Sequence, residues 1–180
     1  MRAIRLQSGH SWKAASGCHI LLIDGGAVRF DYPSPWIVRP TPKYVFLFDH
    51  YPPDDQCLLA VSWKRVPIRG LALSAAGLLN KLAPIETRPP DHRGEIIRVF
   101  RPPLEVAWTE TRFIEPLYGN EVSTRISVAR ADRTQAVLLL DYRPGSEFVV
   151  DAMWKTLVET LAVGDYIEDP ASGRKVAKRG

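Results

Sequence analysis

The second half of the chain contains four strand-like segments in succession, joined by connections too short for a crossover. They cover residues 95–101, 104–115, 121–131 and 134–142. The third segment alternates in the two-residue period of a strand, with Val122, Ile126 and Val128 on one face and polar side chains on the other. A parallel pair needs a crossover of a dozen residues or more, so these neighbours run antiparallel. This succession restricts the chain to folds that contain an antiparallel sheet.

The last of the four segments has a different pattern from the third. It is apolar at every position from Ala136 to Leu140, so neither of its faces is polar. A strand of this kind is typical of a sheet covered on both sides. We therefore expect residues 134–142 to form a central strand.

The first half predicts further strands with different connections. Residues 18–23 and 27–32 form a hairpin around Asp24-Gly25-Gly26, because Asp-Gly and Gly-Gly supply the backbone conformations of tight turns. Residues 43–50 and 56–66 are two more strands. The segment 33–42 contains four prolines, which remove hydrogen-bond donors, and is expected to be a crossing loop anchored by Trp36.

Two segments have helical periodicity. The first lies within residues 71–82 and ends before Pro84, and the polar segment 85–94 after it is expected to be a loop. The second has Ser146 as its N-cap and Gly164 as its C-cap. Each segment has an apolar stripe along one face. In the first segment the stripe consists of Leu71, Ala75, Leu78, Leu79 and Leu82. In the second it consists of Val150, Met153, Trp154, Leu157, Val158 and Leu161. We expect the second stripe to pack against the sheet.

These elements predict one α+β domain with a large, mostly antiparallel sheet flanked by helices. The length of 180 residues is sufficient for a single core without a metal or disulfide. We place the domain at residues 18–164, between an irregular N-terminal segment, residues 1–17, and a basic, flexible tail, residues 165–180. The first apolar run, residues 20–23, is too short for a leader or a membrane span, so we expect a soluble, cytoplasmic chain without membrane contact.

No catalytic or metal-binding motif occurs in the sequence. It has no nucleophile elbow, phosphate loop, zinc-protease motif or dinucleotide fingerprint. The four histidines, His10, His19, His50 and His92, form no closely spaced pair. Cys18 and His19 are adjacent in a strand and therefore point to opposite faces. We expect no catalytic residues, no cofactor and no metal, and we expect Cys18 and Cys57 to be reduced, with a disulfide between them as the alternative.

One strand carries the only candidate site. On residues 104–115 one face contains Glu110 and Arg112 between Trp108 and an isoleucine. These charges form either the polar floor of a cleft or a surface pair where the face becomes exposed, and we favour the pair. Trp108 could also join Arg98 and Arg101 of the preceding strand in a cation–π or anion-binding patch.

The excess of basic residues lies in the tail. The chain has 24 basic and 20 acidic residues, and four of the basic ones are Arg174, Lys175, Lys178 and Arg179. Without these four the chain is formally neutral. Binding of nucleic acid through the tail is therefore only an alternative, because the other basic residues are dispersed among acids.

Three segments resemble the PsbP-like superfamily, which includes the Mog-type Ran-binding proteins, the photosystem subunit PsbP, and bacterial adaptor and lipoprotein relatives. They are FDYPSPW (30–36), AVLLLDYRPGSEF (136–148) and KTLVETLAVG (155–164). The resemblance covers residues 18–164 and implies an α/β/α sandwich, in which an antiparallel sheet lies between helices. Because this fold family is known mainly for binding, no active-site residue is carried over.

The leading functional hypothesis is a non-enzymatic protein-binding or adaptor protein. A chaperone of effectors in a type VI secretion system is a specific case of it, and a homo-oligomer is compatible with it. The alternatives are an enzyme or small-ligand-binding protein with a cleft near Trp108, Glu110 and Arg112, and a weak nucleic-acid binder that uses the basic tail.

Overall fold

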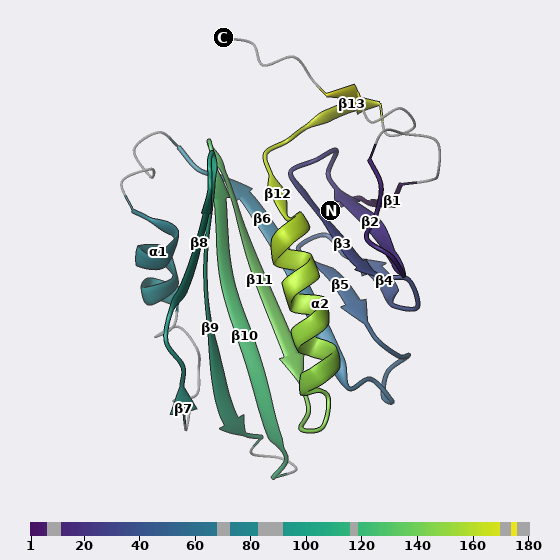
Figure 1. The fold of residues 1–180 in the computed structure, drawn as a ribbon, viewed down its shortest axis with the longest axis vertical. Coiled ribbons are helices and arrows are strands. Elements are labelled where there is room, and N and C mark those ends of the chain that lie inside the picture. Colours follow the sequence, from purple (N-terminus) through teal and green to yellow (C-terminus); the bar gives the residue numbers. More distant parts are fainter. Residues whose placement is uncertain (7–11, 68–72, 83–91, 116–118, 170–173, 176–180) are drawn as a thin grey trace.

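The structure is a computed structural model that describes residues 1–6, 12–67, 73–82, 92–115, 119–169 and 174–175 (Figure 1). The largest element of the fold is an antiparallel sheet. Its strands are β4 (Ile37–Pro40), β5 (Val45–Phe48), β6 (Cys57–Arg65), β11 (Thr134–Tyr142), β10 (Glu121–Ala131), β9 (Leu104–Ile114) and β7 (His92–Arg93), in that spatial order. Strand β8 (Ile97–Arg101) also pairs with β9. The antiparallel sheet expected from the sequence is confirmed.

Strand β11 lies in the centre of this sheet, between β6 and β10. Its register places Leu138 opposite Val61 on one side and Ser127 on the other. Leu138 and Leu140 face the main core, whereas Leu139 packs into a second cluster on the opposite face. The central position expected for this strand is confirmed.

A second, smaller sheet contains the predicted hairpin. It is formed by β1 (Ala3–Arg5), β2 (Cys18–Ile23), β3 (Val28–Pro33) and β12 (Ala162–Val163), in that order. The hairpin turn uses positive φ at Asp24 (45°), Gly25 (69°) and Gly26 (105°). Strands β13 (Ile167–Asp169) and β14 (Arg174–Lys175) form a separate two-stranded ribbon.

Helices cover both faces of the large sheet. Helix α2 (Glu147–Thr160) lies beside the small sheet over one face, and its contacts with β3 join these two parts (Figure 1). Helix α1 (Ala75–Leu82) packs on the other face against β9 and β10. The result is the layered α+β architecture expected from the sequence, with the small sheet as an addition beside α2.

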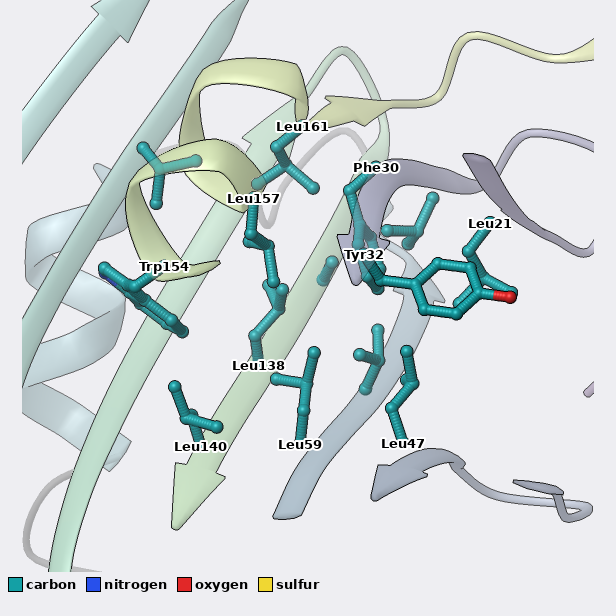
Figure 2. Packing of buried hydrophobic residues seen from close by; sticks show 14 of the residues in the cluster. Leu21, Phe30, Tyr32, Leu47, Leu59, Leu138, Leu140, Trp154, Leu157 and Leu161 are labelled. Carbon is teal, nitrogen blue, oxygen red and sulfur yellow. The ribbon is translucent and has the colours of Figure 1, made fainter. Parts of the chain in front are cut away.

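The main core lies between α2, the small sheet and the large sheet. Figure 2 shows Trp154 and Leu157 of α2, Phe30 of β3, and Leu138 and Leu59 of the large sheet converging there. A smaller cluster on the opposite face joins Leu79 of α1 to Ile126 and Val128. The apolar stripe of the terminal helix therefore packs against the sheet as predicted.

Four expectations about connecting segments are wrong. Residues 1–17 are not wholly irregular, because β1 pairs with β2. The proline-rich segment 33–42 is not only a loop, because β4 pairs with β5; this strand lies at the edge of the sheet, where proline is tolerated. In the segment 85–94, residues 92–93 form β7. In the tail, β13 pairs with β14, and Ile167 is buried in a third cluster.

The end of the terminal helix also differs from its prediction. Ser146 is the N-cap residue, but its side chain makes no capping hydrogen bond, and the helix ends at Thr160 rather than near Gly164. Leu161 is extended, and the next two residues join β3 as β12. Gly164 instead turns the chain after β12 with φ 72°, where a Cβ would lie 3.1 Å from Oγ1 of Thr134. Two predicted residues, Leu71 and Pro84, lie outside the described residues.

Both cysteines are free, so the disulfide alternative is wrong. Cys57 is buried, whereas Cys18 is only half-buried. Among the described residues, no helix combines the length and apolarity that a membrane crossing requires.

Candidate functional site

An open groove of about 540 Å³ lies between α2 and the strands β8, β9 and β10. Its walls are mainly apolar, and charged side chains lie along its rim and floor. The apolar lining residues are Ile97, Val99, Trp108, Trp154 and Val158, and the charged ones are Arg101, Arg125, Asp151, Lys155 and Glu159.

Two periodicities bring these residues together. On β8, alternate side chains point to the α2 side, because Ile97 lies opposite Trp108 and Val99 opposite Val106 of the main core. On α2, the lining residues Asp151, Trp154, Lys155 and Val158 follow the spacing i, i+3, i+4 and i+7, which places them on one stripe of the helix. The groove is thus the space between a strand face and a helix stripe.

Arg125 of β10 forms the charged floor of the groove. Its side chain is 9% exposed, and its Nε donates to Oε2 of Glu110 at 2.9 Å. Its Nη2 donates to Oδ1 of Asp151 on α2. The guanidinium also lies 5.5 Å from the ring of Trp108, 5.6 Å from that of Tyr142 and 6.0 Å from that of Trp154. Two carboxylates and three aromatic rings therefore compensate the buried positive charge.

The titration of this cluster follows from its contacts. Burial acts to raise the pKa of Glu110, but hydrogen bonds from Tyr142 and Arg125 outweigh it and hold the pKa below its ordinary value. Burial and the hydrogen bond to Glu110 raise the pKa of Tyr142 to about 12. Although burial acts to lower the pKa of Arg125, its hydrogen bonds to Asp151 and Glu110 raise it. At neutral pH, Glu110 is therefore a carboxylate, Arg125 a guanidinium and Tyr142 a neutral phenol.

Arg101 closes the end of the groove at the C-terminus of α2. Its Nη2 donates to the carbonyl oxygens of Val158 at 2.6 Å and Leu161 at 3.2 Å, and its Nη1 donates to that of Glu159. These carbonyls have no intrahelical partner, and a cation there also complements the helix dipole. Arg101 therefore holds β8 against the end of α2.

The structure places only some of the five residues of the predicted patch at the groove. Trp108 and Arg101 line the groove, and Glu110 lies beside it, bound to Arg125. Arg112 is half-exposed, and its Nη2 lies 3.7 Å from Oε1 of Glu110. This is the expected i, i+2 pair, but Glu110 is not simply a surface residue. Arg98 points to the opposite face of the sheet, because it pairs with Ala107, and so it does not join Trp108.

The cation over Trp108 is therefore Arg125 rather than Arg98 or Arg101. The sequence analysis assigned no role to Arg125 and placed Trp154 in the core stripe. One feature could have pointed to Arg125. Arg125 lies between Ser123 and Ser127 on one face of a strand that adjoins the central strand. A charge in such a position is removed from water and requires compensating partners.

The lining of the groove combines a rigid aromatic surface with charged side chains. Its described lining residues include no Ser, Cys or His. Within the described ranges, no group of three or more His, Cys, Asp or Glu residues is arranged to hold a metal ion. Trp154 packs edge-to-face against Trp108 with 5.6 Å between ring centres, and these rings provide a rigid apolar surface.

Comparison with known proteins identifies relatives over most of the chain. The model of the Alr1449 family matches residues 19–167. The uncharacterised protein alr1449 from Nostoc sp. strain PCC 7120 is 30% identical over 170 residues, which cover 93% of this chain and 88% of that protein.

Three solved structures are similar at low sequence identity. Cyanobacterial PsbP (CyanoP) from Synechocystis sp. PCC 6803 has a TM-score of 0.60 at 13% identity and covers 87% of this chain and 97% of its own. LpqN, involved in cell envelope biogenesis of Mycobacterium tuberculosis, has a TM-score of 0.55 at 12% identity, with 77% and 85% covered. The Ran-binding protein Mog1p of Saccharomyces cerevisiae has a TM-score of 0.51 at 11% identity, with 81% and 95% covered. The PsbP/Mog-like fold predicted from the sequence is thus confirmed.

Proposed function

The chain belongs to the Alr1449 family, and on that premise we propose that it is a non-enzymatic binding protein whose ligand is another protein. The observation that carries this proposal is the apolar groove beside α2. It adjoins an exposed strand, β8, on which Ile97 is 46% exposed and Phe100 is 73% exposed. Of these two residues only Ile97 lines the groove, and a concave site with mainly apolar walls is typical of places that bind a ligand or partner.

Two further observations support a binding role. The lining residues contain aromatic rings and arginines, which are enriched where proteins bind each other. The fold is shared with Mog1p, which is a Ran-binding protein, although at 11% identity this likeness concerns the fold alone. An effector chaperone of a type VI secretion system would be one specific form of the proposed role.

A selection from displayed random peptides tests the proposal. We expect the wild-type chain to enrich peptides that no longer bind when Ile97→Asp places a charge on the groove wall. Ile114→Asp is the matched control, because Ile114 is a similarly exposed isoleucine (53%) at the end of β9 and does not line the groove. If no enriched peptide distinguishes the two variants, the groove is not a protein-binding site.

The groove volume supports a second candidate, binding of a small apolar molecule. Ligand pockets usually have about 300–1,000 Å³, and this groove lies within that range. A thermal-shift screen of small aromatic and aliphatic compounds, repeated on Ile97→Asp and Ile114→Asp, tests this candidate. It is supported by compounds that stabilise the wild type and Ile114→Asp but not Ile97→Asp, and contradicted if none does so.

A further inference from the structure

Strand β8 forms an edge of the large sheet next to the groove. One side of β8 pairs with β9, and within the described ranges no strand pairs with its other side. Four of its five residues are exposed. An edge of this kind presents unpaired backbone N–H and C=O groups to which an extended segment can add as a further strand.

The two faces of β8 differ in chemistry. Ile97 and Val99 point to the groove, whereas Arg98 and Phe100 point to the opposite face. Side chains of an added strand would alternate in the same way. One set would therefore lie over the apolar groove, and the other set would lie beside Arg98.

The charged side chains of β8 are all positive. The strand contains two arginines and no acidic residue, and Arg101 is already bound to the carbonyls of α2. Arg98 has no hydrogen-bond or ion-pair partner among the described residues. Glu105 lies diagonally from it on β9, and no ion pair joins the two. Since none of the acidic residues that the structure describes pairs with Arg98, this side chain favours a carboxylate on the added strand.

From the free edge, the apolar groove and the unpaired arginine, we infer that β8 binds an extended acidic segment of a partner protein by strand addition. Apolar side chains of the segment lie in the groove, and acidic side chains lie beside Arg98. On the groove side, the exposed rim residues Lys155 and Glu159 of α2 carry opposite charges, so the preference for an acidic segment rests on Arg98. This inference rests on the proposed protein-binding function and specifies the chemistry of the partner.

The test uses capped peptides of about seven residues, which is slightly longer than β8. The first peptide alternates Asp and Leu, and the second alternates Lys and Leu. A third has the acidic sequence with a methyl group on every backbone nitrogen, so that its side chains remain but its N–H donors are lost. Titration calorimetry on the full chain measures their affinities.

We expect the acidic peptide to bind the wild type at least about tenfold more tightly than the basic or the methylated peptide. Arg98→Glu should reverse the preference between acidic and basic peptides. Arg39→Glu is the matched control, because Arg39 is an exposed arginine on β4, the opposite edge of the sheet, and its replacement should leave the preference unchanged.

Several results would overturn this inference without affecting the proposed function. The first is equal affinity for the acidic and basic peptides, the second is equal affinity for the acidic peptide and its methylated form, and the third is an unchanged preference in Arg98→Glu. In each case the proposed function still holds if the displayed peptides depend on Ile97. Sedimentation of the free chain adds a further outcome. A dimer that dissociates in Arg98→Glu would mean that a second copy occupies the edge. If no displayed peptide depends on Ile97, the proposed function itself fails.

Discussion

Arg125 has an environment that few charged residues occupy. Its side chain is 9% exposed, yet it contacts Glu110 on the neighbouring strand and Asp151 on α2, whose side chain is 64% exposed. Removing one partner of such a cluster leaves a nearly buried charge poorly compensated, which costs more than the pair contributes. The position of the Arg125 side chain on the groove floor therefore depends mainly on Glu110, which is the more buried of the two carboxylates.

Glu110→Gln is expected to destabilise the fold by about 2 kcal/mol at neutral pH, because charged hydrogen bonds to Arg125 and Tyr142 are lost. The pKa of Glu110 lies below its ordinary value in the folded state. The stabilisation is therefore complete above the ordinary value, about 4.3, and is lost as the pH falls through the folded-state pKa. Urea unfolding from pH 7 downward measures both effects.

The difference in unfolding free energy between wild type and Glu110→Gln should shrink as the solution is acidified. Glu95→Gln is the control, because Glu95 is exposed just before β8. A difference that stays constant from neutral to strongly acidic pH would show that the carboxylate of Glu110 does not stabilise the folded state through its charge.

The two thiols should differ in reactivity. Burial, with a smaller effect of Asp49, raises the pKa of Cys57 to about 11, and its side chain is buried. Because the thiolate is the reactive form, Cys57 should resist a disulfide reagent at about pH 8 until the chain unfolds, whereas the half-buried Cys18 reacts earlier. In Cys18→Ser the native protein should therefore show almost no thiol reaction. Rapid labelling of native Cys18→Ser would contradict the burial of Cys57.

At the scale of elements, α2 is held to the sheet in two ways. Its inner face contributes Val150, Trp154 and Leu157 to the main core. Figure 2 shows Trp154 and Leu157 there. The C-terminal carbonyls of α2 receive hydrogen bonds from Arg101 of β8. Arg101 therefore joins the two walls of the groove at this end.

Arg101→Met should destabilise the chain by about 1–3 kcal/mol, since it removes the donor while keeping most of the aliphatic side chain. Hydrogen exchange should also become faster in β8 and in the last turn of α2. Arg98→Met is the matched control on the same strand, and it should change stability by less than about 0.5 kcal/mol. Equal effects of the two substitutions would mean that Arg101 does not stabilise the end of α2.

At the scale of the whole molecule, the formal charge is unevenly distributed along the chain. The four basic residues Arg174, Lys175, Lys178 and Arg179 account for the whole net charge of +4. Two of them, Arg174 and Lys175, form β14 and pair with β13, so the basic segment begins within a folded ribbon. Any nucleic-acid binding by this chain is therefore expected to depend on these four positions.

Replacing all four with Gln should abolish whatever affinity the chain has for duplex DNA without lowering its melting temperature. For the wild type, four phosphate contacts limit the slope of log K against log salt to about −3.6. Fluorescence anisotropy at several salt concentrations measures this slope. A steeper slope, or binding that survives the replacement, would place the DNA contacts elsewhere on the molecule.

Much of the architecture was predictable because strand and helix periods are local properties. Segments 121–131 and 134–142 have the same bounds in the structure as in the prediction, since their alternation and turns are encoded within a few residues. The short strands β1, β4, β7, β12, β13 and β14 were missed. Their few residues carry no period of their own, and they are strands only because a neighbour offers hydrogen bonds.

The candidate site was only partly predictable. The pattern of β9 identified Trp108 and Glu110 as unusual, but it could not identify the cation that joins them. Arg125 is 15 residues from Glu110 and 26 from Asp151, and these partners meet only through strand register and the placement of α2. Arg98 was misplaced for a related reason: alternate residues of one strand face opposite sides, and only the register with β9 decides which side meets α2.

The sequence by itself determined that this chain forms an antiparallel sheet with a terminal helix packed on it, because apolar periodicity dictates which faces leave water. The tertiary structure alone decided that a groove lies beside that helix and that β8 is exposed at its edge. It also decided that Arg125, rather than the arginines of β8, lies over Trp108. These features depend on contacts between residues far apart in the chain, and such contacts leave no periodic trace in the sequence.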